Sequence, residues 1–270
     1  MKIRAIILSA LILCGISAVI MYSRAAQPQQ TSSVITQAIN DKNTPMVIKN
    51  LILKMKEQME VNDDQFPELI RNVENYTNSL ADSASVAVLH SMLAEMYQNY
   101  YQRNQWTINQ RTQLSGYIPE DIREWTSNLF TDKIKEEIDL SLRPTVLLQN
   151  TPVSKFKDIL EIGKDSQTLR PTLYEFLAFR ALDIQPTVQI YKDLIAFQNK
   201  EPNMKSVLLT ELDYLRFLYG DKRDKESFEA YMNALDELYR NLASQNYAAE
   251  ILIAKLDLVS GSMFRYVSTQ

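Results

Sequence analysis

The chain has 270 residues, of which 46% are hydrophobic, and it carries a formal net charge of −4 at pH 7. This length is ample for one or two hydrophobic cores, and no basic run or face is visible that would suit nucleic acid as a partner. Only 5 glycines and 9 prolines occur, which is few for a protein rich in strands or loops, so the composition favours packed helices.

Residues 1–26 have the three parts of a secretory signal peptide: a basic start with Lys2 and Arg4, an apolar run over residues 5–21, and small residues at the end. We expect cleavage on either side of Ala26 and export of the chain to the periplasm or cell envelope. An uncleaved membrane anchor is the alternative, because the run lies near the lower length limit for crossing a bilayer. In that case this segment would be the chain's contact with the membrane.

The sole cysteine, Cys14, lies inside the apolar run and follows Leu13. Because a lipoprotein cysteine normally follows a small residue, we do not expect a lipid anchor here. Once the signal is removed, the mature chain has no cysteine for a disulfide, a thiol nucleophile or a thiolate metal site. Residues 27–44 are polar at their start and are expected to form a spacer before a helical domain of residues 45–270.

Apolar residues recur at steps of three and four along most of the chain, which is the period of one face of an α-helix. Prolines mark several expected helix starts, because the proline ring fixes φ and the first turn needs no N–H donor there. The expected helices cover residues 45–59, 67–80, 84–106, 119–142, 153–162, 173–182, 188–198, 207–219, 228–242 and 247–259.

The segment 84–106 is the expected central helix of the fold. Its apolar face includes Leu93, Tyr97 and Tyr100, which we predict to be buried between neighbouring helices, whereas Ser91, Glu95 and other polar residues form the expected wet face.

Helices of this length joined by short turns predict an all-α protein built as an array of antiparallel helical hairpins. The array would be tetratricopeptide-like or an irregular α-α superhelix, and a plain bundle is a further alternative.

The single histidine, His90, lies on the flank of the apolar face of the central helix. A catalytic dyad or triad would require a nucleophile and an orienting acid beside it, and Ser91 points to a different helix face. We therefore expect His90 to be partly buried and bonded to a backbone or side-chain group.

The other residue types that carry chemistry also have simpler structural interpretations. Asp63-Asp64 lacks the remainder of a calcium-loop spacing, and Glu120-Asp121 and Glu136-Glu137 are expected to be solvated helix faces. Trp106 and Trp125 fall on apolar helical periods and are expected to pack in the core. No catalytic, cofactor-binding or metal-binding residue is assigned, although two carboxylates of a glycosidase can lie far apart in a chain.

Five segments resemble, in this order, the N-terminal helical region of large bacterial alpha-2-macroglobulin-family proteins. They are residues 90–106 (HSMLAEMYQNYYQRNQW), 119–130 (PEDIREWTSNLF), 147–160 (LLQNTPVSKFKDIL), 170–182 (RPTLYEFLAFRAL) and 212–239, which end in MNALDELY. The resemblance implies a secreted or envelope protein related to proteinase traps, which use macroglobulin β-domains, a bait region and often a Cys-Gln thioester. This sequence has no Cys-x-Glu-Gln motif and no run of alternating strands, so it resembles the leading helical segment alone.

Together, these observations predict an exported, non-enzymatic helical scaffold or protein-interaction module without a cofactor. The resemblance suggests macroglobulin-type domains as its protein partner. The alternative function is a cell-envelope hydrolase whose carboxylates the sequence does not identify.

Overall fold

The computed structural model contains only α-helices and short 3-10 turns as regular structure in its described residues, which confirms the all-α prediction. The predictions for the signal peptide, Cys14 and Asp63-Asp64 lie outside these residues. The chain divides into two compact units, Met1–Ile184 and Gln185–Gln270. The described residues are 44–61, 65–112, 116–160, 165–200, 203–220, 222 and 224–267.

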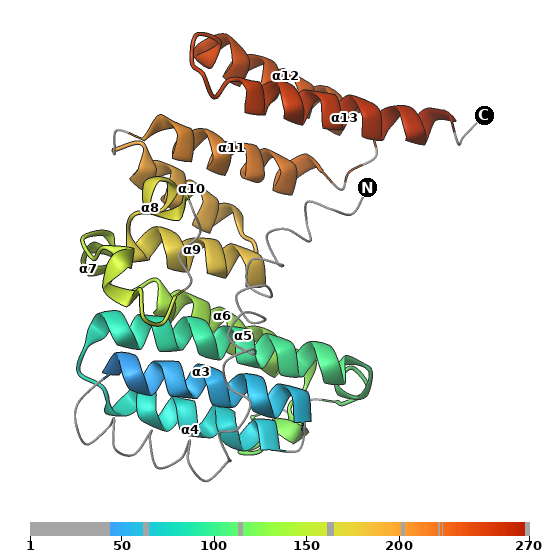
Figure 1. The fold of residues 1–270 in the computed structure, drawn as a ribbon. Coiled ribbons are helices and arrows are strands. Elements are labelled where there is room, and N and C mark those ends of the chain that lie inside the picture. Colours follow the sequence, from blue (N-terminus) through green and yellow to red (C-terminus); the bar gives the residue numbers. More distant parts are fainter. Residues whose placement is uncertain are drawn as a thin grey trace. The chain divides into compact units, whose positions relative to one another are not determined.

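The first unit holds seven α-helices in its described residues, which follow one another in chain order (Figure 1). They are α3 (Thr44–Val61), α4 (Phe66–Ser79), α5 (Ser83–Ile108), α6 (Ser127–Ser141), α7 (Thr145–Gln149), α8 (Ser166–Leu169) and α9 (Leu173–Ile184), with 3-10 turns at Ile122–Glu124 and Val153–Phe156.

Helix α5 is the central element of this unit, as predicted, and it packs against α3, α4, α6 and α9 (Figure 1). The carboxylate of Asp82 accepts a hydrogen bond from the Ser85 N–H and caps the start of the helix. Leu93, Tyr97 and Tyr100 are buried, which confirms their predicted place between helices. Much of α5 is buried on every side, because it has neighbours all around rather than along one stripe.

Aromatic rings hold α5 against the chain segment that leads into α6. The Tyr97 ring stacks on Trp125 at a centroid distance of 5.6 Å and meets Phe130 edge-on at 6.5 Å. The indole N–H of Trp125 donates a hydrogen bond of 2.8 Å to the Pro119 carbonyl. Trp125 itself is half-buried, so it covers the edge of the core with its ring and pairs its polar atom, and the prediction that it packs in the core holds only in part.

The predicted helix over residues 119–142 begins later than expected, at Ser127. Asp121 caps the separate 3-10 turn instead, where its side chain accepts a hydrogen bond from the Arg123 N–H. Trp125 then adopts extended backbone angles, φ −66° and ψ 147°. The prediction was wrong here because the Asp121 carboxylate caps a separate turn, and the half-buried Trp125, bonded to the Pro119 carbonyl, interrupts the helical path before α6.

The predicted helix over residues 153–162 was also wrong, since Val153–Phe156 form a 3-10 turn. The Val153 N–H donates to the Pro171 carbonyl at 2.9 Å, and the Leu173 N–H donates to the Thr151 carbonyl at 2.8 Å. These long-range backbone bonds form an isolated antiparallel bridge beside the start of α9. The N–H groups of Lys155 and Lys157 then donate to the carbonyls three residues earlier, as in a 3-10 turn.

Helix α9 begins where the sequence predicted. The Thr172 N–H donates to the Glu175 carboxylate at 3.1 Å, and the Glu175 N–H donates to the Thr172 hydroxyl at 3.2 Å. This reciprocal pair is a capping box, which satisfies two N–H groups that the first turn leaves free.

The second unit holds four helices in its described residues: α10 (Val188–Gln198), α11 (Met204–Tyr219), α12 (Lys225–Leu242) and α13 (Ala249–Val267). Each overlaps a predicted helix, but α13 continues through Gly261 to Val267, so its predicted end at Val259 was wrong. Its core joins α11, α12 and α13 through residues such as Leu208, Tyr231, Leu235 and Ile251. Thr187, Asn203 and Asp224 each accept a hydrogen bond from the N–H three residues on, at the starts of α10, α11 and α12.

Within the described part of the chain, no helix combines the length and the apolarity needed to cross a membrane.

Candidate functional site

His90 belongs to a buried polar network between α5 and α6. Its Nδ1 lies 2.7 Å from Oε2 of Glu137, and the ammonium of Lys133 lies 2.8 Å from the other carboxylate oxygen. The His90 side chain is 15% exposed and that of Glu137 is 3% exposed. The prediction of a partly buried, hydrogen-bonded histidine is confirmed. The prediction that Glu137 lies on a solvated face was wrong, whereas Glu136 beside it is exposed.

The carboxyl group of Glu137 is held in its ionised form. Burial by itself raises its pKa, but the hydrogen bonds and positive charges of His90 and Lys133 outweigh burial, so the pKa of Glu137 lies below its ordinary value. Among the described residues, no hydroxyl is bonded to the His90 ring, so this acid–histidine pair has no nucleophile in place. The network joins two helices.

A second polar contact joins α9 to the face of α5 that was predicted to be wet. Arg180 donates from Nε to the Ser91 hydroxyl at 2.8 Å and from a terminal nitrogen to the Glu95 carboxylate at 2.6 Å. Ser91 is buried, so the prediction of a wet face was wrong at this point. Arg180 is the one basic residue in the largely apolar helix α9, and this was the signal for the contact, because a half-buried cation needs acceptors nearby.

A third contact joins α4 to α5 through Tyr97, whose hydroxyl donates to Glu74 at 2.7 Å. Burial, the bond to Glu74 and the nearby Glu137 charge all raise the pKa of Tyr97, so the hydroxyl keeps its proton and stays a donor.

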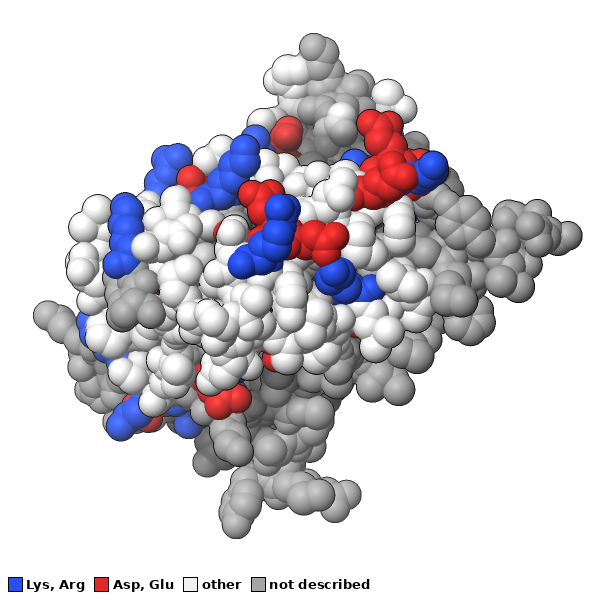
Figure 2. All heavy atoms as spheres, turned by 90° about the horizontal axis from the view of Figure 1, so that it is seen from above, with Lys and Arg blue, Asp and Glu red and all other residues white. Residues whose placement is uncertain are grey.

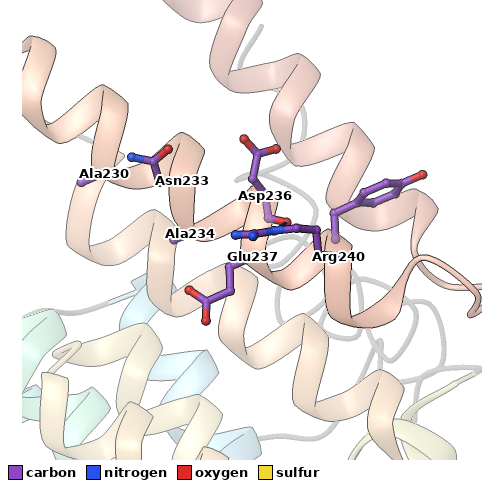
Figure 3. A pocket seen from close by; sticks show the side chains of 7 residues that line it. Ala230, Asn233, Ala234, Asp236, Glu237 and Arg240 are labelled. Carbon is purple, nitrogen blue, oxygen red and sulfur yellow. Dashed lines mark hydrogen bonds between the residues drawn. The ribbon is translucent and has the colours of Figure 1, made fainter.

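Helix α12 carries an open hollow of about 650 Å³ (Figure 3). Asp236 makes an ion pair with Lys255 of α13, and Figure 3 shows the Asp236 and Glu237 side chains pointing in opposite directions. Two carboxylates that diverge do not form the facing pair that glycoside hydrolysis requires. The hollow is lined by Ala230, Asn233, Ala234, Asp236, Glu237, Tyr239 and Arg240.

Helix α13 exposes the large apolar side chains of Leu252, Ile253, Leu256 and Val259. Leu252, Leu256 and Val259 follow one another along one side of the helix, and we call this row the α13 stripe. Leu256 is 66% exposed, whereas Ile251 on the opposite face is fully buried in the core with α11 and α12. The helix therefore has two apolar faces, of which one is covered within the unit. Apolar residues occupy both of these faces in the sequence 251–259, but the prediction gave only the bounds of the helix.

Trp106 is 79% exposed, so its prediction as a core residue was wrong. Ile108, two residues further along α5, is fully buried, so this end of the helix still packs against the core. Successive residues of an α-helix are about 100° apart, so Trp106 lies on the side of α5 away from Ile108 and points into solvent.

Charges on the face that Figure 2 views are mixed in sign. Acidic and basic side chains lie beside one another there, and no basic stripe is seen on that face. Within the described ranges, no three acidic or histidine side chains converge in a way that would hold a metal ion.

The helices and their contacts define an all-α protein in which the polar networks described above serve helix packing. Comparison with protein-family models, curated proteins and solved structures found no match for this chain. The resemblance to the alpha-2-macroglobulin family remains a prediction from the sequence.

Proposed function

We propose that this chain is an exported, non-enzymatic helical scaffold whose work is to bind protein through the α13 stripe. The proposal includes an array of antiparallel hairpins as its architecture, in keeping with the packing of chain neighbours such as α11 on α12 and α12 on α13.

The α13 stripe is the observation that carries this proposal. Leu252, Leu256 and Val259 are spaced along one side of a single helix, and each is 39% exposed or more. Apolar side chains scattered singly are normal on protein surfaces, but a continuous row indicates a place where another molecule binds. Covering such a row removes apolar area from water, which stabilises a complex by about 25 cal/mol for each Å².

The contacts of the polar side chains support a non-enzymatic role. Glu137 is held by His90 and Lys133, and Arg180 is held by Glu95. These groups link helices of the first unit. Proteinase trapping is not part of the proposal, because the sequence has no thioester motif. The resemblance suggests macroglobulin-type domains as protein partners.

The experiment is site-specific photo-crosslinking in the cells that produce the chain. A photoreactive amino acid replaces Leu256 in the stripe or, as the matched control, Glu237 on α12, which is also exposed. We expect light to give a protein adduct from position 256 and little or none from position 237. The proposal would be abandoned if position 256 gave no protein adduct, or no more than position 237 gives.

A further inference from the structure

We propose that the α13 stripe is the seam through which two copies of this chain pair. This inference rests on the proposed function and deepens it, because it names a second copy of the chain as the protein that covers the stripe.

The spacing of the seam indicates that its occupant is an α-helix. Ala249, Leu252, Leu256 and Val259 are all exposed and follow one another at steps of three, four and three, and Met263 continues the pattern in the sequence. Alternate steps of three and four average 3.5 residues, which keeps one apolar row facing a partner helix. A strand or extended peptide would need free backbone groups to pair with, and the side of a helix offers none.

The charges around the seam favour an identical copy. Lys255 flanks it, but its ammonium is bonded to Asp236 of α12 in the same chain. Ile253 and Ser260, on the other flank, are uncharged. The flanks therefore carry no row of like-charged side chains. Such a row would repel a second copy and would favour a partner of opposite charge. An uncharged apolar seam is complementary to itself, as a two-fold interface requires.

The length of the seam sets the expected strength of pairing. From Ala249 to Val259 it extends about 15 Å at the helical rise of 1.5 Å per residue. This is short for an interface of standard size, so the pair should be reversible and should separate on dilution.

The test is the molar mass of the full chain in solution, measured by sedimentation equilibrium over a range of concentrations. Leu252→Glu places a charge in the seam, and Leu147→Glu makes the same exchange on α7. The two leucines are 47% and 43% exposed, so neither change should unfold the chain, and thermal melts verify this.

We expect the mass of the unaltered chain and of Leu147→Glu to rise toward twice the chain mass by about 100 µM, where a pair with a micromolar Kd is largely formed. Leu252→Glu should stay at one chain mass. A single chain mass for the unaltered protein throughout, or pairing that survives Leu252→Glu, would overturn the inference.

The photo-crosslinking experiment separates the two proposals. If position 256 gives an adduct with a different protein while the purified chain stays monomeric, self-pairing is overturned and the protein-binding function stands. If there is neither an adduct nor a dimer, both proposals are overturned.

Discussion

Glu137 shows how strongly the surroundings of one residue determine its chemistry. It lies beside Glu136 in the sequence, yet the Glu136 side chain is 58% exposed and that of Glu137 is 3% exposed. Two adjacent carboxylates look equivalent in the sequence. The turn of α6 that points Glu137 toward His90, 47 residues earlier, depends on how α5 and α6 pack. The local period of apolar residues does not predict which side chains of two distant helices will meet.

We expect Glu137→Gln to lower the free energy of unfolding at pH 7 by about 1–3 kcal/mol, because charge-assisted bonds to a buried acceptor are lost. Since the pKa of Glu137 in the folded chain lies below its ordinary value of 4.5, the ionised carboxylate contributes stability above pH 4.5. This contribution is lost as the pH falls through the folded-state pKa, so the difference between variant and parent should shrink in acid. Urea unfolding at several pH values measures both effects.

Glu136→Gln is the matched control, since it removes an exposed carboxylate that also contacts Lys133. An exposed pair of this kind contributes about 0–1 kcal/mol. Equal losses from the two substitutions, or a Glu137→Gln deficit that does not change with pH, would contradict the structural role given to the buried carboxylate.

The helices themselves were largely predictable where a strong apolar period coincided with a capping residue. Thr187 and Pro186 mark the start of α10, and the prediction of residues 188–198 matches that helix at both ends. The prediction failed for residues 153–162, where a 3-10 turn forms next to a backbone bridge to Pro171 and Leu173 of another segment. A pattern along the chain cannot reveal an acceptor that the fold brings in from another segment. The α13 stripe was missed for a related reason, because the period does not say how many faces of a helix will be covered.

At the level of elements, we expect Leu93→Ala in α5 to lower the free energy of unfolding by about 2–5 kcal/mol, as for other large-to-small changes in a core. Leu93 is 1% exposed at the centre of the first unit. Leu256→Ala in α13 is the control, and in the monomeric chain it should change stability by at most about 0.5 kcal/mol. Chemical unfolding at low protein concentration provides the comparison; a Leu93→Ala variant as stable as the control would place α5 outside the core.

At the level of the whole molecule, the structure tests some of the predictions from sequence and not others. The scarcity of glycine and proline and the helical period of the apolar residues led to the all-α class, which the described helices confirm. Export depends on residues 1–26, which lie outside the described part, and the macroglobulin resemblance depends on short segments. Both stay predictions. The protein-binding function depends instead on the exposure of Leu252, Leu256 and Val259, which only a folded structure provides.

Cysteine labelling in intact cells tests export and protein binding together. In a chain with Cys14→Ser, a single cysteine replaces Leu256 in the stripe or Glu237 on α12, and a maleimide that does not cross the inner membrane is added. We expect the cysteine at position 237 to react quickly in cells and the one at 256 to react slowly, because protein covers the stripe. After purification and dilution, both should react at similar rates. Equal rates in cells would contradict coverage of the α13 stripe, and a lack of labelling at both positions in cells would contradict export.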